Sequence, residues 1–136
     1  IPLRQITVTA GEGWHWEATE LDKYAEGRLI LPEGIEKIGK REQRQAEICT
    51  EGLRSLGMRV FSGPHQSGTV SFVPDCGCEE MAEFLGGEGI CVRAGLHCAP
   101  IAHESAGTLE TGTVRVSFGF ATNMMQIEEF LTACAK

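Results

Sequence analysis

One stretch of the sequence, Cys91 to Pro100, concentrates residue types that can do chemistry. It combines a thiol at Cys98 with an imidazole at His97 and a guanidinium at Arg93. Cysteine is a nucleophile only as the thiolate, and nearby cations or the N-terminus of a helix favour that form. Pro100 suits the first position of a short helical turn, which would place a helix N-terminus beside the thiol. We therefore predict a reactive site here, with an inert buried cysteine as the alternative that spacing alone leaves open.

Two more residues extend this prediction. His103 lies close enough in sequence to be a third cation near the thiol. Arg115 lies in the run Thr113–Phe118, where apolar residues alternate and fall on one face of a strand. Its guanidinium must therefore reach water or a partner on the other face, and its planar fork matches a carboxylate. Arg115 is a candidate carboxylate-binding residue, with an ordinary surface arginine as the alternative.

Zinc binding is the rival chemistry, because thiolates and imidazoles are common zinc ligands. The candidate ligands are Cys76, Cys78, Cys91, Cys98, His97 and His103. However, Cys76 and Cys78 are separated by one residue rather than the usual two or more, and Cys91 alternates with apolar neighbours. We therefore predict no metal site. Glu104 and Glu110 are interpreted as ordinary loop carboxylates, since no pattern fixes their geometry.

The elements that must position these residues follow from hydrophobic periodicity and turn residues. In chain order, the first elements are a helix from Pro32 to Gly57 and the strands Met58–Phe61 and Thr69–Val73. A helix Glu79–Leu85, stopped by Gly86 and Gly87, and the strands Gly89–Val92 and Thr113–Phe118 follow. The last element is a helix that is capped by Asn123 with Gln126 and runs to Ala135. This order predicts an α+β fold, a small and mostly antiparallel sheet with helices on one face.

Length and composition limit the function classes. With 136 residues, the chain fits one compact domain. The net charge of −7, without a clustered basic face, argues against a nucleic-acid partner. We see no apolar run long enough to span a membrane and no export leader, so we expect a cytoplasmic location and reduced cysteines. Within Ile1–Leu31, only Ile6–Thr9 predicts a strand, and we assign no function there.

The segment Gly89–Pro100, followed by Gly112–Phe118, closely resembles the C-terminal part of cysteine desulfurases, which belong to the class V aminotransferase superfamily. The shared pattern is RAGxHCAxx followed by GTVRxSF. The segments Gly34–Glu42 and Asn123–Ala133 also follow this family in order and spacing. The resemblance covers roughly Leu31 to Lys136.

This resemblance implies the small C-terminal domain of a fold-type-I enzyme that uses pyridoxal phosphate to take sulfur from L-cysteine and leaves L-alanine. Cys98 matches the nucleophile that carries the persulfide, and Arg115 matches the arginine that holds the substrate carboxylate. Arg93 matches an arginine at the edge of the active site, and His97 precedes the nucleophile. The family also implies a homodimer, a sulfur-acceptor protein and a role in iron–sulfur cluster assembly.

The sequence departs from the family at the cofactor. The family's lysine lies in a Ser-x-His-Lys context, which Lys23, Lys37, Lys40 and Lys136 all lack. We therefore assign no residue to pyridoxal phosphate, and we expect the chain alone neither to hold it nor to turn over cysteine. Residues 1–31 lack the resemblance and are expected to be a linker or an altered N-terminal segment before a domain at 32–136. The alternatives are a selenocysteine lyase, a class V aminotransferase, or a standalone sulfur-carrying or interaction domain.

Overall fold

The computed structural model describes residues 6–9, 13–16, 35–119 and 121–136. The chain divides into two units, Ile1–Ile38 and Gly39–Lys136. In the first unit, β1 (Ile6–Thr9) pairs antiparallel with β2 (Gly13–Trp16), which confirms the strand predicted at Ile6–Thr9. The helix start predicted at Pro32 lies outside the described residues.

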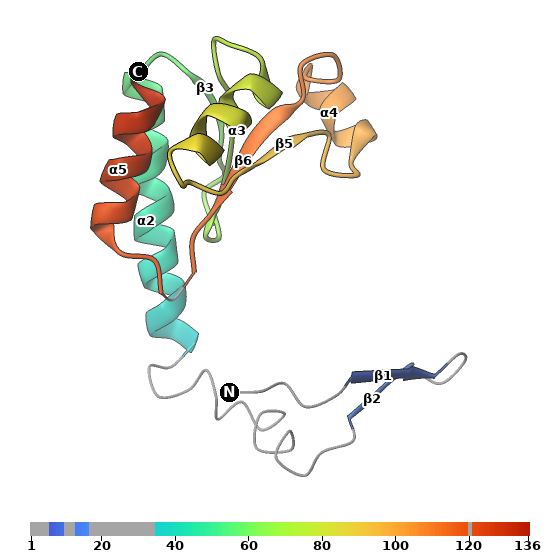
Figure 1. Ribbon diagram of the computed structural model, residues 1–136. Coiled ribbons are helices and arrows are strands. Elements are labelled where there is room, and N and C mark those ends of the chain that lie inside the picture. The colour runs from blue at the N-terminus through green and yellow to red at the C-terminus, as the bar shows by residue number, and fades with distance from the viewer. Residues whose placement is uncertain (1–5, 10–12, 17–34, 120) are drawn as a thin grey trace. The chain divides into compact units, whose positions relative to one another are not determined.

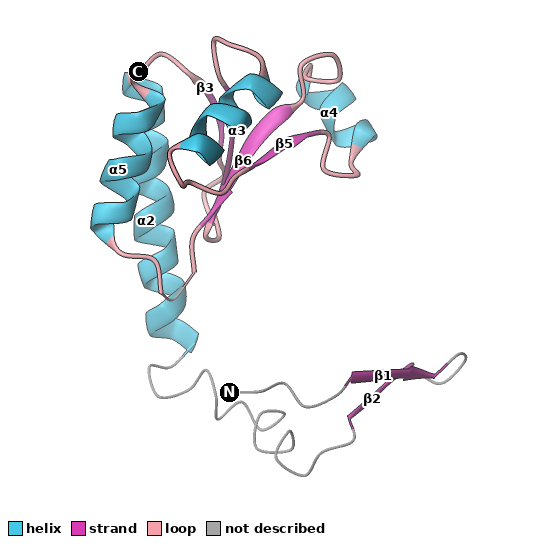
Figure 2. Cartoon of the chain, viewed as in Figure 1, coloured by secondary structure: helices cyan, strands magenta, loops and turns pink. Residues whose placement is uncertain are grey.

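The second unit is an α+β layer structure (Figure 1; Figure 2). Its elements are α2 (Ile35–Ser55, which begins in the first unit), β3 (Arg59–Phe61), β4 (Thr69–Val73), α3 (Cys78–Gly87), β5 (Arg93–Gly95), α4 (Pro100–Ala106), β6 (Thr113–Ser117) and α5 (Met124–Cys134). The sheet has the order β3-β4-β6-β5, and every neighbouring pair is antiparallel. The predicted fold class is confirmed.

The core lies between one face of the sheet and the helices α2, α3 and α5. Val70 and Phe72 of β4 and Val114 of β6 are completely buried, because alternate residues of a strand share a face. Leu53 of α2 belongs to the same buried cluster, and the ring of Phe130 of α5 packs edge-on against Phe72 at 6.0 Å. These three helices thus cover one face of the sheet and leave the opposite, polar face free of them.

The segment that leads into Cys91–Pro100 differs from the prediction, because α3 ends later than expected. The helix includes Gly86 and ends at Gly87, and Gly89, two residues further on, has a left-handed φ of 80°. There the N–H of Ile90 donates to the carbonyl of Leu85 at 2.8 Å, as in a Schellman motif. Because this N–H is used at the helix end, the strand predicted at Gly89–Val92 lies three to four residues later, as β5.

Two helix starts follow the prediction. Pro100 is the first residue of α4, the short helix that precedes β6. Asn123 caps α5, and its side chain and that of Gln126 exchange hydrogen bonds with each other's backbone N–H at 3.0 Å. Among the described residues, no helix is long and apolar enough to cross a membrane.

Candidate active site

The polar face of the sheet carries a row of residues from all four strands. The register pairs Arg115 of β6 with Ser71 of β4 on one side and with Arg93 of β5 on the other. Phe61 of β3 pairs with Ser71 and extends the row. Because paired residues point to the same face, these four side chains lie on the side opposite the core.

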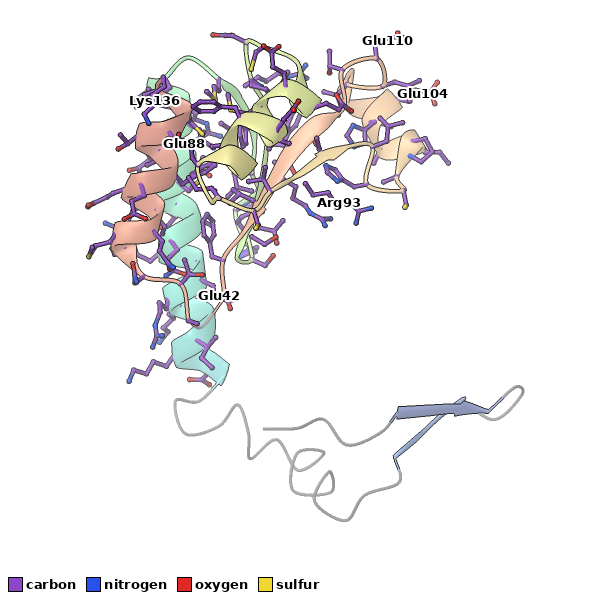
Figure 3. The ribbon with its side chains drawn as sticks, in the orientation of Figure 1. Glu42, Glu88, Arg93, Glu104, Glu110 and Lys136 are labelled. Atoms are coloured by element: carbon purple, nitrogen blue, oxygen red, sulfur yellow. The ribbon has the colours of Figure 1, made fainter. Side chains whose placement is uncertain are left out.

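Arg93 and Arg115 therefore face each other directly across two strands. Like charges in such pairs are unfavourable, by a few tenths to about 1 kcal/mol. Neither guanidinium has an ion pair or a hydrogen bond to any of the described residues. Arg115 is half-buried, whereas Arg93 is exposed and lies beside β5 (Figure 3). Two adjacent cations without a protein anion make this face suited to an anionic ligand.

A cavity of about 330 Å³ lies between this row and α4. Arg115, Ser71 and Phe61 line it from the sheet, and α4 contributes the small side chains Ala102 and Ala106. The helix α4 thus lies over the polar face, whereas the other helices of this unit cover the core face. The arrangement gives a small pocket with one cationic wall and one mostly apolar wall.

Cys98 lies next to this cavity in the chain: its neighbours His97 and Ala99 both line it, and Cys98 itself does not. The thiol side chain itself is exposed. His97 and Cys98 have φ values of 51° and 59°, and the N–H of Ala99 donates to the carbonyl of Leu96 at 2.9 Å. Positive φ at both central positions is typical of a type I′ turn, which normally contains Gly, Asn or Asp. Holding other residues there costs about 1–3 kcal/mol each, and such strain is concentrated at functional sites.

The other cysteines lack this setting. All six lie in the described residues and are free thiols. Burial raises the pKa of Cys49 and of Cys134 to about 12. The charge of Cys134 makes a smaller contribution at Cys49, and that of Cys76 makes one at Cys134. Burial also raises the pKa of Cys78. Cys76 and Cys91 are exposed, but neither they nor their neighbours line the cavity. Cys98 is therefore the cysteine best placed to act on a ligand bound there.

His97 ties the Cys98 turn to β6. Its Nε2 lies 3.1 Å from both the carbonyl oxygen and the hydroxyl oxygen of Thr113. A carbonyl oxygen only accepts, so Nε2 carries the hydrogen, and Nδ1 holds the lone pair of the neutral ring. This Nδ1 is buried and has no partner among the described residues. His97 therefore acts as a neutral anchor of the turn.

The pKa of His97 is lowered, first because burial disfavours the imidazolium and then because Arg115, His103 and Arg93 repel its charge. The hydrogen bond to the Thr113 carbonyl opposes this shift. At a pH between the folded and the unfolded pKa, a base with a lowered folded pKa stays neutral in the folded chain, whereas the unfolded chain takes up a proton. We thus expect the stability contribution of His97 to be complete above about pH 6.5 and to decline as the pH falls from there to its lowered folded pKa.

His97→Gln tests this expectation, because the glutamine amide can still donate to Thr113 but does not titrate. Between about pH 7 and about pH 5.5, the urea midpoint of the variant should fall less than that of the unchanged chain. His65→Gln, at an exposed histidine before β4, is the matched control and should keep the full pH dependence. Equal pH dependence in the unchanged chain and His97→Gln would show that His97 is not held neutral.

The other residues considered as metal ligands or carboxylates lie as follows. Within the described part of the chain, no three His, Cys, Asp or Glu side chains are arranged to hold a metal ion. Cys78 begins α3, and Cys91 lies in the loop between α3 and β5. Glu104 and Glu110 are both exposed (Figure 3), but the loop prediction is wrong for Glu104, which lies within α4, and holds for Glu110, which lies between α4 and β6.

The structure also adds residues that sequence spacing did not indicate. Ser71 and Phe61 reach the site from strands more than 35 residues before Arg115 along the chain. Thr108 and His103 form the far wall. The sequence indicates His103 as a nearby cation or metal ligand, and neither interpretation describes its observed contacts; Thr108 belongs to the stretch that carries the family resemblance.

Comparison with known proteins shows the family to which the chain is similar. The profile of the family described as Aminotransferase class-V matches residues 28–130. A probable cysteine desulfurase of Xylella fastidiosa is 36% identical over 106 residues, which are 76% of this chain and 25% of that protein. One from Pyrococcus abyssi is 36% identical over 104 residues, 72% of this chain and 25% of that protein. The chain thus spans about a quarter of the length of these curated relatives.

Solved structures agree with the fold. The apo structure of a cysteine desulfurase from Thermococcus onnurineus superposes with a TM-score of 0.77 at 27% identity, covering 96% of this chain and 36% of that one. An Escherichia coli cysteine desulfurase in an S-sulfonic acid form gives a TM-score of 0.73 at 19% identity, covering 94% and 35%. At that identity, the second likeness shows the fold alone.

Proposed function

The chain belongs to the aminotransferase class-V family, and from this premise we propose that it is a cysteine desulfurase domain in which Cys98 takes sulfur from L-cysteine. One observation carries the proposal: an exposed cysteine on a strained turn lies between two residues that line a cavity, and the same cavity is lined by an arginine with no ion pair to the described residues. The similarity to cysteine desulfurases over about three quarters of the chain supports it.

In this proposal, Arg115 holds the α-carboxylate of the substrate. Its guanidinium is half-buried beside an apolar wall, so a bidentate bond to a carboxylate is less screened than on an open surface. Arg93 adds positive charge from the exposed side of the row and favours approach of the anion. Together they orient the amino acid relative to Cys98.

The sulfur transfer then balances without any external oxidant. The Cys98 thiolate attacks the sulfur of the substrate, a sulfur–sulfur bond forms, and the carbon–sulfur bond breaks. Its electron pair stays with the substrate carbon, which takes a proton and becomes the methyl group of L-alanine. Sulfur is oxidised and carbon is reduced, and Cys98 is left as a persulfide. Because Cys98 is exposed, a sulfur-acceptor protein can reach it.

Pyridoxal phosphate, which the family implies, does not fit the described residues. It is held through a lysine, and no lysine lines the cavity beside Arg115. Lys37 and Lys40 are exposed on α2, and Lys136 pairs with Glu88 at 2.5 Å. We therefore derive no step through the cofactor and assign its attachment to no residue described here. The proposal requires a polypeptide that supplies the lysine and carries this domain, as a homodimer in the family's manner.

The proposal is tested by following L-cysteine in the pyridoxal-phosphate-loaded enzyme that contains this domain. We expect L-alanine and protein-bound or released sulfur to form in equal amounts. Transfer of the amino group to a 2-oxo acid without sulfur release would indicate an aminotransferase instead. Turnover of selenocysteine but not of cysteine would indicate a selenocysteine lyase.

A further inference from the structure

His103 is held in one orientation on the wall of the cavity. Its side chain is 7% exposed, and its Nδ1 lies 2.8 Å from the hydroxyl oxygen of Thr108. Thr108 is itself only 2% exposed, so this contact lies within the protein. A buried imidazole has ring nitrogens that need hydrogen-bond partners, whereas phenylalanine or leucine would fill the same space without a polar atom to satisfy.

The hydrogen bonds also indicate which ring nitrogen of His103 carries the hydrogen. The Thr108 hydroxyl donates to the backbone carbonyl of His103 at 3.4 Å, which uses its single hydrogen. Its oxygen can then only accept from the ring, so Nδ1 is the protonated nitrogen and Nε2 has the lone pair. Nε2 has no hydrogen-bond partner among the described residues, and it is not sealed from solvent. His103 lines the cavity and its Nδ1 is engaged by Thr108, so Nε2 is the ring nitrogen left for a ligand there.

His97 has the opposite arrangement, although the two rings lie only 5.9 Å apart between centroids. Its Nε2 is the hydrogen-bearing nitrogen, and its lone pair is at the buried Nδ1. His97 therefore cannot receive a proton from a ligand, even though it is the histidine next to Cys98. His103 is the histidine whose free nitrogen a ligand can reach.

We propose that His103 accepts a proton at Nε2 from the ammonium group of an amino acid whose carboxylate is held by Arg115. This inference rests on the proposed function, because it needs an amino acid in the cavity. The ammonium group loses one proton and becomes an amine, His103 becomes an imidazolium ion, and no electrons are transferred. The amine has a free lone pair and can act as a nucleophile, which the ammonium ion cannot.

The first test reads the tautomers directly and needs no activity. In long-range ¹H–¹⁵N NMR spectra of the 136-residue chain, neutral His103 should carry its hydrogen on Nδ1, and neutral His97 on Nε2. Thr108→Val should remove this preference from His103, whereas Thr108→Ser should keep it. If His103 carries its hydrogen on Nε2 in the unchanged chain, the proposal is wrong.

The second test separates proton transfer from a structural role. In His103→Asn, the amide nitrogen takes the place of Nδ1 and keeps the bond to Thr108, but nothing replaces Nε2. In the loaded enzyme, kcat for L-cysteine should fall by about 10²-fold or more, with KM changed only a few-fold, because carboxylate binding remains. His65→Asn is the control at an exposed histidine and should match the unchanged enzyme.

Full kcat in His103→Asn would overturn the proposal while leaving the desulfurase function intact. If the unchanged enzyme forms no persulfide, the proposed function fails instead, and the NMR result still decides the tautomer of His103. The two failures are therefore distinguishable.

Discussion

Replacing Cys98 by serine is expected to abolish sulfur transfer and to leave the fold intact. A hydroxyl is far less acidic and less nucleophilic toward sulfur than a thiol, so the persulfide cannot form. We expect the rate to fall by about 10³-fold or more, the order seen when an enzyme loses its nucleophile. The side chain is exposed and the substitution nearly isosteric, so the melting temperature should stay within a few degrees.

The chain provides matched controls for this variant. Cys91→Ser and Cys76→Ser change exposed cysteines that do not border the cavity, and both should keep full activity. Cys98→Gly adds a separate measurement, because glycine adopts positive φ without strain. It should be inactive yet more stable than Cys98→Ala, by about 1 kcal/mol. Persistent sulfur release in Cys98→Ser, or loss of activity in Cys91→Ser, would place the nucleophile elsewhere.

Replacing Arg115 by glutamine is expected to have the second largest effect, on binding of the substrate carboxylate. Two charge-assisted hydrogen bonds are lost, which together contribute about 3 kcal/mol, or roughly 10²-fold in kcat/KM. Arg115→Lys keeps the charge but loses the planar fork, so it should recover only part of this loss. Arg54→Gln, on the exposed surface of α2, is the control and should change nothing in the kinetics.

The stability of the Arg115 variant should move in the opposite direction. Arg93 lies directly opposite Arg115 on β5, so removal of one cation relieves a cross-strand repulsion. Arg115→Gln should therefore unfold at the same or a slightly higher urea concentration, by up to about 1 kcal/mol. A strongly destabilised variant would mean that Arg115 serves the fold rather than a ligand.

Much of the fold could be predicted from local pattern. The sequence correctly predicts the alternation in β4 and β6, the Asn123 cap and the helix end at Gly57, because each depends on neighbours in the chain. The predicted position of the strand before the reactive turn, Gly89–Val92, is wrong, because three glycines close together could each end the preceding helix. Only the structure shows that Gly89, rather than Gly86 or Gly87, adopts the left-handed conformation that ends α3.

The site is less predictable than the fold, for three physical reasons. Propensity alone does not put His97 and Cys98 at positive φ, since such positions favour glycine and asparagine. Arg93 and Arg115 oppose each other only in the observed strand register. A slip of one residue would move the side chains of one strand to the other face of the sheet. Contacts such as His103 with Thr108 depend on the path of the turn after α4. What spacing could indicate was the reactive stretch itself, and a family resemblance was needed to assign roles within it.

The central claim, that Cys98 carries sulfur taken from L-cysteine, is tested most directly by peptide mass spectrometry of the loaded enzyme after brief incubation with L-cysteine and alkylation. The account predicts that the peptide containing Cys98 gains the mass of one sulfur atom, and that the peptides containing Cys76 and Cys91 do not. Unmodified Cys98 under conditions in which L-alanine accumulates would contradict it.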